Sequence, residues 1–442
     1  MRYTALIIIA IFTLGGAATH TLAMPKLYSY LLAPINNYCI NPTYLKHSFE
    51  NAKSIFIARV NEIKEEEIIL EINKTWKGNP NKKLIISKED ICLHQGYEVG
   101  KSYIIYADHS HNPDEPNKHV ISMFSRIRPM TQGQIEIQYL DALSKNQDTK
   151  HIDTSLINIL KNNNKKISLR IEAAELLDEK LIWNDISIPK EDATKALMEA
   201  LKSDNPKLKV TIMHGSEFQN SKNAYDNLIQ LLENDNQHVV NTAAMYLPEM
   251  AYNKSDILKS KAFESLFSAM ERTKLKNWEN TELYEASLLT IGEAIAKLAG
   301  ILKEKRNKEK VANILHNSIK EVNDPFNKSL LITYISWMKR HATKALDDIK
   351  SYVINYEDCR IITASIEAVG RIDPDGFPEF IKQTAIPAMK KQYKNCNYRF
   401  FDTIEDLGSA AKDIKPFLSE EYKTMEDGYF KNKLKTILDA LE

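Results

Sequence analysis

The larger, C-terminal part of the chain repeats one pattern of apolar and polar positions. Apolar residues recur at helical spacing, as in Leu228, Leu231 and Leu232 and then Val239 and Ala243. This spacing is typical of amphipathic helices that bury one face. Because short Asn- and Asp-rich segments interrupt the pattern at intervals, it predicts helices arranged as consecutive pairs.

The interrupting segments contain residues that end one helix and start the next. They are Lys161 to Lys165, Ser203 to Pro206, Asn234 to Asn236, Asn323 to Pro325, Asn355 to Asp358, and Lys394 to Asn397. Asp, Asn and Ser side chains accept hydrogen bonds from the first amides of a helix, and Pro fits there because its missing N–H is not needed. The segments recur at roughly 32 to 45 residues, the period of two-helix repeats.

Two segments add a likeness to a known repeat. Leu169 to Ala174 and Glu367 to Ile372 resemble the second helix of HEAT repeats, which carries an apolar-Arg step, a pair of Ala, and then Leu-Gly with a basic residue. Small residues at Ala243 and Ala294 would let neighbouring helices approach closely. The resemblance implies an all-α HEAT-like solenoid over residues 152 to 442, with about eight helix pairs. An irregular helical bundle is the alternative.

Residues 38 to 145 follow a different pattern. Short β-branched and aromatic runs alternate with charged or turn-forming segments, which predicts strands. The runs are 54 to 60, 68 to 73, 84 to 86, 103 to 106 and 120 to 124. Five such strands predict a small all-β barrel, and a helix from Thr131 to Leu143 is expected to close the domain.

The order of several motifs in this region is similar to that of the netrin-like domain shared with tissue inhibitors of metalloproteinases. They are Cys39, Ile55 to Val60, Lys74 to Gly78 with its Trp-Lys-Gly step, Cys92, and Gly100 to Ala107. The resemblance implies an OB-type barrel with a disulfide between Cys39 and Cys92. The chain departs from the family after the last strand, where Ser125 to Arg128 stand in place of a further Cys.

The first residues have the pattern of an export signal. Met1 and Arg2 provide a positive start, Ala5 to Leu14 is an apolar run, and Thr21 to Ala23 offers small residues for cleavage. We expect residues 1 to 23 to be a signal peptide and the protein to be periplasmic or extracellular. An uncleaved anchor is the alternative. No later stretch approaches the ~20 apolar residues of a membrane span.

Four cysteines in an exported chain favour disulfides, with one bridge inside each domain as the simplest pairing. Cys39 and Cys92 belong to the N-terminal region. Cys359 and Cys396 lie about one repeat apart, each after an Asp or Asn turn at the expected start of a second helix. Equivalent positions of adjacent repeats are neighbours, so we predict a Cys359 to Cys396 bridge. Two buried free thiols are the alternative.

Charge and motifs assign no catalytic residue, metal or cofactor. Lys plus Arg and Asp plus Glu both number 59, without the basic stripe of a nucleic-acid binder. Asp108, His109, His111, Asp114, Glu115 and His119 are metal-ligating types in one loop, but their spacing matches no specific site, and a polar loop is preferred. His214 to Glu217 carries no nucleophile context and is predicted to break a helix. The chain is therefore expected not to be an enzyme.

A protein-binding surface on the repeats remains. Four further aromatic or basic residues are candidates for this surface, but we expect most of them to pack between helices. They are Trp278, Tyr284, Trp337 and Arg340. Tyr398, Arg399, Phe400 and Phe401 are the predicted binding residues, because four consecutive side chains cannot all face one side of a helix.

These observations predict an exported scaffold that binds a protein partner. The alternative is a metalloprotease inhibitor acting through the netrin-like domain. In animal relatives that mechanism uses a Cys at the mature N-terminus, whereas Cys39 would follow about fifteen residues here. Inhibition is therefore disfavoured, and an enzyme ranks third.

Overall fold

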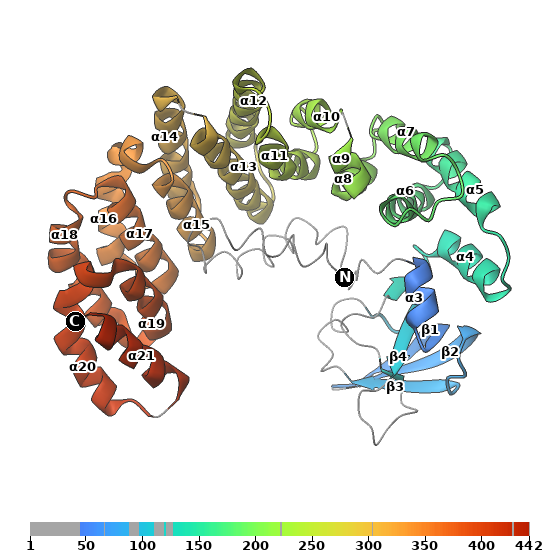
Figure 1. Cartoon of the computed structure of the whole chain (residues 1–442), viewed down its shortest axis with the longest axis horizontal. Helices are drawn as coiled ribbons and strands as arrows, with labels where there is room; N and C mark the ends of the chain where they lie inside the picture. Colours follow the sequence, from blue (N-terminus) through green and yellow to red (C-terminus); the bar gives the residue numbers. More distant parts are fainter. Residues whose placement is uncertain are drawn as a thin grey trace. The chain divides into compact units, whose positions relative to one another are not determined.

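The computed structural model describes residues 45–65, 67–87, 97–109, 119–120, 127–221, 223–302, 304–426 and 428–441. These residues are mostly helical, with a small antiparallel sheet near the N-terminus (Figure 1). They divide into two compact units between Ala224 and Tyr225. The expected order of a β region followed by helices is confirmed in this coarse form. The predicted signal peptide, Cys39 and Cys92 lie outside the described residues.

The first four strands lie where the sequence pattern predicts them, whereas the short strand β6 was not predicted. They are β1 (Ser54–Ile63), β2 (Glu67–Lys77), β3 (Lys83–Ser87), β4 (Ser102–His109), β5 (His119–Val120) and β6 (Ile127–Pro129). All pairs are antiparallel in the order β3-β2-β1-β4-β5, and β6 pairs with β4 as well. Of the last predicted strand only Val120 is described. Among the described strands, no pairing joins β3 to β5 or β6.

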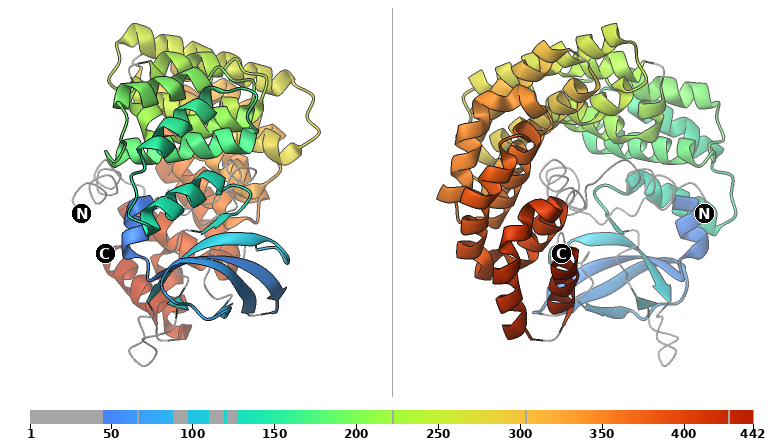
Figure 2. Two further views of the ribbon diagram at one scale, coloured as in Figure 1. Left: turned by 90° about the vertical axis from the view of Figure 1, so that its right-hand side faces the viewer. Right: turned by 60° about the vertical axis from the view of Figure 1, so that its left-hand side comes forward.

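The twisted sheet, blue and cyan in Figure 2, is buried on both faces. Phe56 and Val60 pack with Leu70 on one face, and Ile55 packs with Tyr106 on the other. Leu140 of α4 (Gln134–Ser144) lies against this second face, beside residues of α3 (Leu45–Asn51) and the residue after it. Burial of both faces explains why β1 reads as a nearly continuous apolar run. The closing helix predicted at residues 131 to 143 is α4.

The end of β2 depends on a glycine and a tryptophan. Gly78 has φ +77°, and a Cβ there would lie 2.1 Å from Ser54 Oγ, so a larger residue would be strained. Trp76 is half-buried against the apolar cluster beneath α4. Its Nε1 donates to Asp141 Oδ1 at 2.6 Å. Trp76 therefore joins β2 to α4 as a packing residue.

The remaining helices of the N-terminal unit are α5 (Lys150–Lys161), α6 (Ile167–Ile182), α7 (Lys190–Ala200), α8 (Pro206–His214) and α9 (Ser216–Asn220). Successive helices pack together, and α6 also contacts α8. The predicted break at His214 is confirmed, because Gly215 is extended between α8 and α9. Asp178 accepts hydrogen bonds from the amides of Ser216 at 3.2 Å and Glu217 at 2.8 Å, which caps α9.

The C-terminal unit continues the series of helices. Its elements are α10 (Ala224–Leu231), α11 (Gln237–Ala251), α12 (Asp256–Leu275), α13 (Thr281–Ile301), α14 (Lys305–Glu321), α15 (Pro325–Ser336), η2 (Lys339–Ala345), α16 (Leu346–Asn355), α17 (Cys359–Ile372), α18 (Phe377–Phe380), the π-helical turn η3 (Ile381–Ala385), α19 (Ile386–Leu407), η4 (Gly408–Ile414), α20 (Lys415–Thr424) and α21 (Tyr429–Ala440).

These helices form two layers inside the C-terminal unit (Figure 2). In the first layer α11, α13, α15, α17, α19 and α21 each contact the next. The intervening helices pair with them, as α12 does with α13, α14 with α15 and α16 with α17. Ala294 and Ala296 are buried in α13, which agrees with the close approach expected of small residues. Within the described residues, none of the helices has both the length and the apolar character of a membrane span.

Most predicted turns separate helices as expected. Asn205 caps α8 by accepting from the Leu208 amide at 3.1 Å, and Asn236 caps α11 by accepting from the His238 amide at 3.0 Å. Asp324 and Asp358 cap α15 and α17 in the same way. These side chains satisfy amides that the helix itself leaves without acceptors.

The turn predicted at Lys394 to Asn397 is wrong, because this segment lies inside α19. Met389, Tyr393 and Cys396 are buried, and Phe400 continues the same row one turn later. Burying each large side chain contributes ~1.5 to 3 kcal/mol, whereas Asn in a helix costs less than ~1 kcal/mol. Packing therefore outweighs the local preference for a turn.

A disulfide joins Cys359 and Cys396, with a Cα–Cα distance of 5.4 Å. The predicted pairing is confirmed. Cys359 begins α17 as expected, but Cys396 lies within α19 and not at its start. The pairing survives this shift because α17 and α19 are neighbours in one layer.

Candidate functional site

The predicted binding group is not an exposed cluster. Phe400 and Phe401 are fully buried, so the expectation that they are exposed is wrong. Helix α19 packs against both α17 and α21, and consecutive side chains therefore meet different neighbours. Arg399 is half-exposed, and the side chain of Tyr398 lies outside the described part. A binding role for Arg399 stays a prediction.

The other aromatic candidates pack as expected. Trp278 donates from Nε1 to the Thr273 carbonyl at 2.8 Å, and its ring centroid lies 5.5 Å from that of Tyr284. Trp337 lies 5.1 Å from Tyr334. Arg340 is exposed and forms an ion pair with Asp375 at 2.9 Å.

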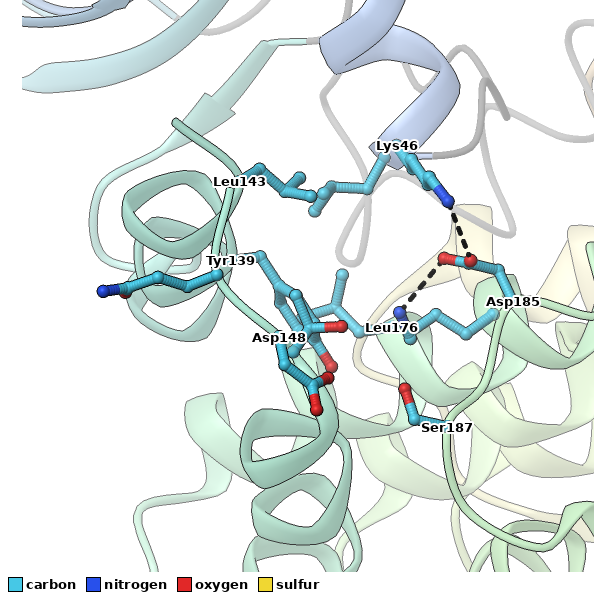
Figure 3. Close-up of a pocket in the computed structure, with 11 residues that line it drawn as sticks. Lys46, Tyr139, Leu143, Asp148, Leu176, Asp185 and Ser187 are labelled. Carbon is cyan, nitrogen blue, oxygen red and sulfur yellow. Dashed lines mark hydrogen bonds and ion pairs between the residues drawn. The ribbon is translucent and has the colours of Figure 1, made fainter. Parts of the chain in front are cut away.

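A cavity of about 280 Å³ in the N-terminal unit is lined by several charged and polar side chains. It lies between α3, α4, α6 and the segment that follows α6 (Figure 3). Leu143 and Leu176 supply apolar walls, while Lys46 and Asp185 approach each other across the opening. The remaining lining residues are Leu45, Tyr139, Gln147, Asp148, Thr149, Lys180 and Ser187.

Asp185 connects two lysines at this cavity. One carboxylate oxygen lies 3.4 Å from Lys46 Nζ and the other lies 3.3 Å from Lys180 Nζ. The Lys180 side chain is only 7% exposed. Desolvation lowers the pKa of Lys180, and the neighbouring Asp153 opposes that shift. Desolvation raises the pKa of Asp185.

Asp153 is the buried centre of the network. It lies 3.4 Å from Lys180 Nζ, accepts from the Ser187 amide at 2.7 Å, and accepts from the Tyr139 hydroxyl. Burial, together with the charge of Asp153, raises the pKa of Tyr139. Each of these polar groups has a protein partner. The arrangement therefore fixes α4, α5 and α6 together, and the cavity is the space left beside the network.

A second buried network lies at the start of α4. Glu172 of α6 accepts at Oε1 from the amides of Ile135 at 2.7 Å and Glu136 at 2.9 Å, which caps α4 from a distant helix. Glu136 in turn accepts from the Tyr106 hydroxyl at 2.7 Å and pairs with Arg128 at 3.0 Å. Desolvation raises the pKa of Glu172 to about 7, against the lowering effect of the two amides.

Sequence reasoning did not single out these residues. One signal was present, because Asp153 precedes Leu156 and Leu160 on the buried face of α5, and Lys180 continues the buried face of α6. A charged residue at an apolar position indicates a buried partner. The partner itself cannot be identified from spacing alone.

The structure brings together no metal site from the described residues, since no group of three or more His, Cys, Asp or Glu is suitably placed. Most of the predicted polar loop after Asp108 lies outside them. No protein-family model matches the chain, and no curated protein matches it.

Proposed function

We propose that the chain is an exported, non-enzymatic scaffold that binds a protein partner. In this proposal a HEAT-like α-solenoid spans residues 152 to 442 and recognises the partner. A netrin-like OB-type barrel over residues 38 to 145 precedes it.

The packing of alternate helices is the observation that carries the proposal. In the C-terminal unit α11, α13, α15, α17 and α19 contact one another in series, and the intervening helices α12, α14 and α16 pair with α13, α15 and α17. Repeats that contact only their neighbours characterise solenoids, whose extended surfaces bind other proteins. The strand positions and the antiparallel order are those expected of such a domain, although no pairing among the described strands closes the sheet.

The alternative of metalloprotease inhibition depends on Cys39 at the mature N-terminus, and this residue lies outside the described part. The polar networks of the N-terminal unit connect side chains within the protein. They add no support for inhibition.

Site-specific crosslinking tests the proposal. A photoreactive residue is placed at Arg340, which is exposed in the C-terminal unit, and at Glu62, which is exposed on β1. The tagged protein is irradiated in its native cell envelope, and captured proteins are identified after fractionation. The proposal predicts reproducible capture of one partner from Arg340 and none from Glu62. Capture from Glu62 alone would assign recognition to the sheet, and no capture from either position would refute a protein-binding scaffold.

A further inference from the structure

The cavity of about 280 Å³ in the N-terminal unit, which we call the α4–α6 cavity, is lined by both apolar and polar side chains (Figure 3). Its volume lies just below the usual range of small-molecule pockets, ~300 to 1,000 Å³, so it suits a ligand of about one ring. Among its lining residues, Leu176 and Lys180 are buried, whereas Lys46 and Ser187 are exposed. A ligand that enters from solvent would therefore reach a buried charged group.

The ion pairs of this cavity leave hydrogen-bonding capacity unused. Lys46 Nζ lies 3.4 Å and Lys180 Nζ 3.3 Å from the carboxylate of Asp185, longer than the ~2.7 to 2.9 Å of strong charge-assisted bonds. An ammonium group carries three donors, and among the described residues Asp185 is the one acceptor of Lys46. The Asp185 carboxylate has about four acceptor positions and gives these lysines two of them. Unused donors and acceptors therefore lie side by side.

Three further polar side chains line the cavity and form no hydrogen bond with any described residue. They are the amide of Gln147 and the hydroxyl groups of Thr149 and Ser187. Figure 3 shows the Ser187 hydroxyl turned toward the cavity. Because an amide or a hydroxyl both donates and accepts, these side chains match a ligand whose own groups do the same.

The charges of the lining balance each other. The two lysines, Lys46 and Lys180, are accompanied by Asp148 and Asp185, and Asp153 lies 3.4 Å from Lys180 Nζ. An anion in the cavity would meet a carboxylate, and a cation would meet an ammonium group, so either would be repelled by a like charge. The lining therefore favours a neutral polar ligand.

Water alone does not complement the whole lining. It can satisfy the polar groups, but it leaves Leu45, Leu143 and Leu176 facing water. Covering apolar area is favourable in proportion to the area removed from water. A neutral carbon ring that carries several hydroxyl groups meets both requirements, because its C–H groups cover the leucines while each hydroxyl donates one hydrogen bond and accepts others.

We propose that the α4–α6 cavity binds a polyhydroxylated ring of the size of one monosaccharide. Its hydroxyl groups accept from Lys46 and donate to Asp185, and the Ser187 hydroxyl bonds to a further one. Its C–H face covers Leu143 and Leu176. This inference goes beyond the proposed scaffold function and stands without it.

Saturation-transfer NMR with the full chain tests this binding. The probes are glucose, galactose, mannose and myo-inositol. Cyclohexanol, leucine and a phosphorylated glucose are matched ligands that lack the further hydroxyl groups, carry a zwitterion or carry an anion. At least one of the four polyols should bind in the millimolar range or more tightly, and the three matched ligands should bind more weakly. The proposal is overturned if none of the polyols shows saturation transfer, or if any matched ligand binds as tightly as the best of them.

Matched variants locate the site. Ser187→Ala removes one hydrogen bond and Lys46→Gln removes the cationic donor, so each should weaken binding of the polyol by about fivefold. Ser144→Ala and Lys145→Gln change an exposed Ser and an exposed Lys at the end of α4, neither of which lines the cavity. These controls should leave the affinity unchanged, and equal effects of the cavity and control variants would overturn the assignment.

Leu143→Trp tests the cavity by filling it. Leu143 is only partly buried, so the larger ring can occupy the cavity without displacing the core. Polyol binding should be lost while the unfolding temperature is kept. A folded Leu143→Trp protein that binds the polyol with wild-type affinity would overturn the proposal. If this variant does not fold, the exposed positions Ser187 and Lys46 still decide the outcome.

Discussion

The buried carboxyl of Glu172 leads to a specific prediction about stability and pH. Glu172 is 1% exposed, and its Oε1 accepts both amide hydrogen bonds at the start of α4. Its Oε2 is buried and has no hydrogen-bond partner in the described structure. Burial deprives the charged carboxylate of solvation by water but costs the protonated carboxyl much less. Burial therefore raises the pKa of Glu172 from 4.5 to about 7.

The sign of the effect follows from proton binding. The folded N-terminal unit binds the Glu172 proton more tightly than the unfolded chain does, so this group favours folding most below pH 4.5. Its contribution falls as the pH rises from 4.5 to about 7 and is lost above that. The shift corresponds to about 3 kcal/mol in the free energy of unfolding.

Glu172→Gln removes this dependence while keeping an oxygen that can accept both amides. The new NH₂ group is buried without an acceptor and costs ~1 to 3 kcal/mol, equally at every pH. We therefore expect the stability of the variant relative to the wild type to rise by about 3 kcal/mol between pH 4.5 and pH 8. Other titrating groups, including Asp178, whose pKa is also raised by burial, cancel in this difference.

Hydrogen–deuterium exchange in increasing urea, followed for peptides from α4 and α6, measures the unfolding free energy of this unit separately. Glu62→Gln, which neutralises an exposed carboxylate on β1, is the matched control and should remain parallel to the wild type. A constant difference between Glu172→Gln and the wild type from pH 4.5 to pH 8 would refute the reasoning.

Three further predictions concern packing and covalent structure. Gly78→Ala should lower the stability of the N-terminal unit by at least ~1 kcal/mol, because φ is +77° and Ser54 leaves no space; an unchanged thermal midpoint would contradict this. Replacing Cys359 and Cys396 by Ser removes a bridge between residues 37 apart in sequence and should lower the free energy of unfolding in urea by about 3 to 4 kcal/mol. Equal urea midpoints for the oxidised and the reduced wild-type protein would argue against this. Phe400→Ala should cost ~3 to 5 kcal/mol, and a normal melting temperature in differential scanning calorimetry would place this ring at the surface.

The parts of the fold that depend on residues close together in the sequence were predictable. The β-branched runs at residues 54 to 60 and 68 to 73 became β1 and β2, because alternation and branching favour extended backbone locally. Asn205, Asn236 and Asp358 became helix caps, because their short side chains reach amides two or three residues further on.

Where local preference and packing disagree, packing decided the structure. The Asn-rich segment at Lys394 to Asn397 predicts a turn, yet the buried row through Tyr393, Cys396 and Phe400 keeps α19 helical. The same crowding buries Phe400 and Phe401, which were expected to be exposed. The number of neighbours around a helix is not contained in its own sequence.

The candidate sites show the same division. Periodicity placed Asp153 and Lys180 on buried helix faces, but only the folded unit brings them within 3.4 Å of each other. Cys359 and Cys396 were paired on the expectation that each begins a second helix, whereas the structure joins them because α17 and α19 pack side by side.

By itself, the sequence determined where most helices and strands lie and which side chains cap the helices, because these features follow from local spacing. The tertiary structure alone decided which charged side chains are buried, which aromatic residues are exposed and where cavities lie. Burial and electrostatic coupling are set by contacts between segments distant in sequence, such as the 37 residues that separate Glu172 from the Ile135 amide it accepts, and no local pattern records those contacts.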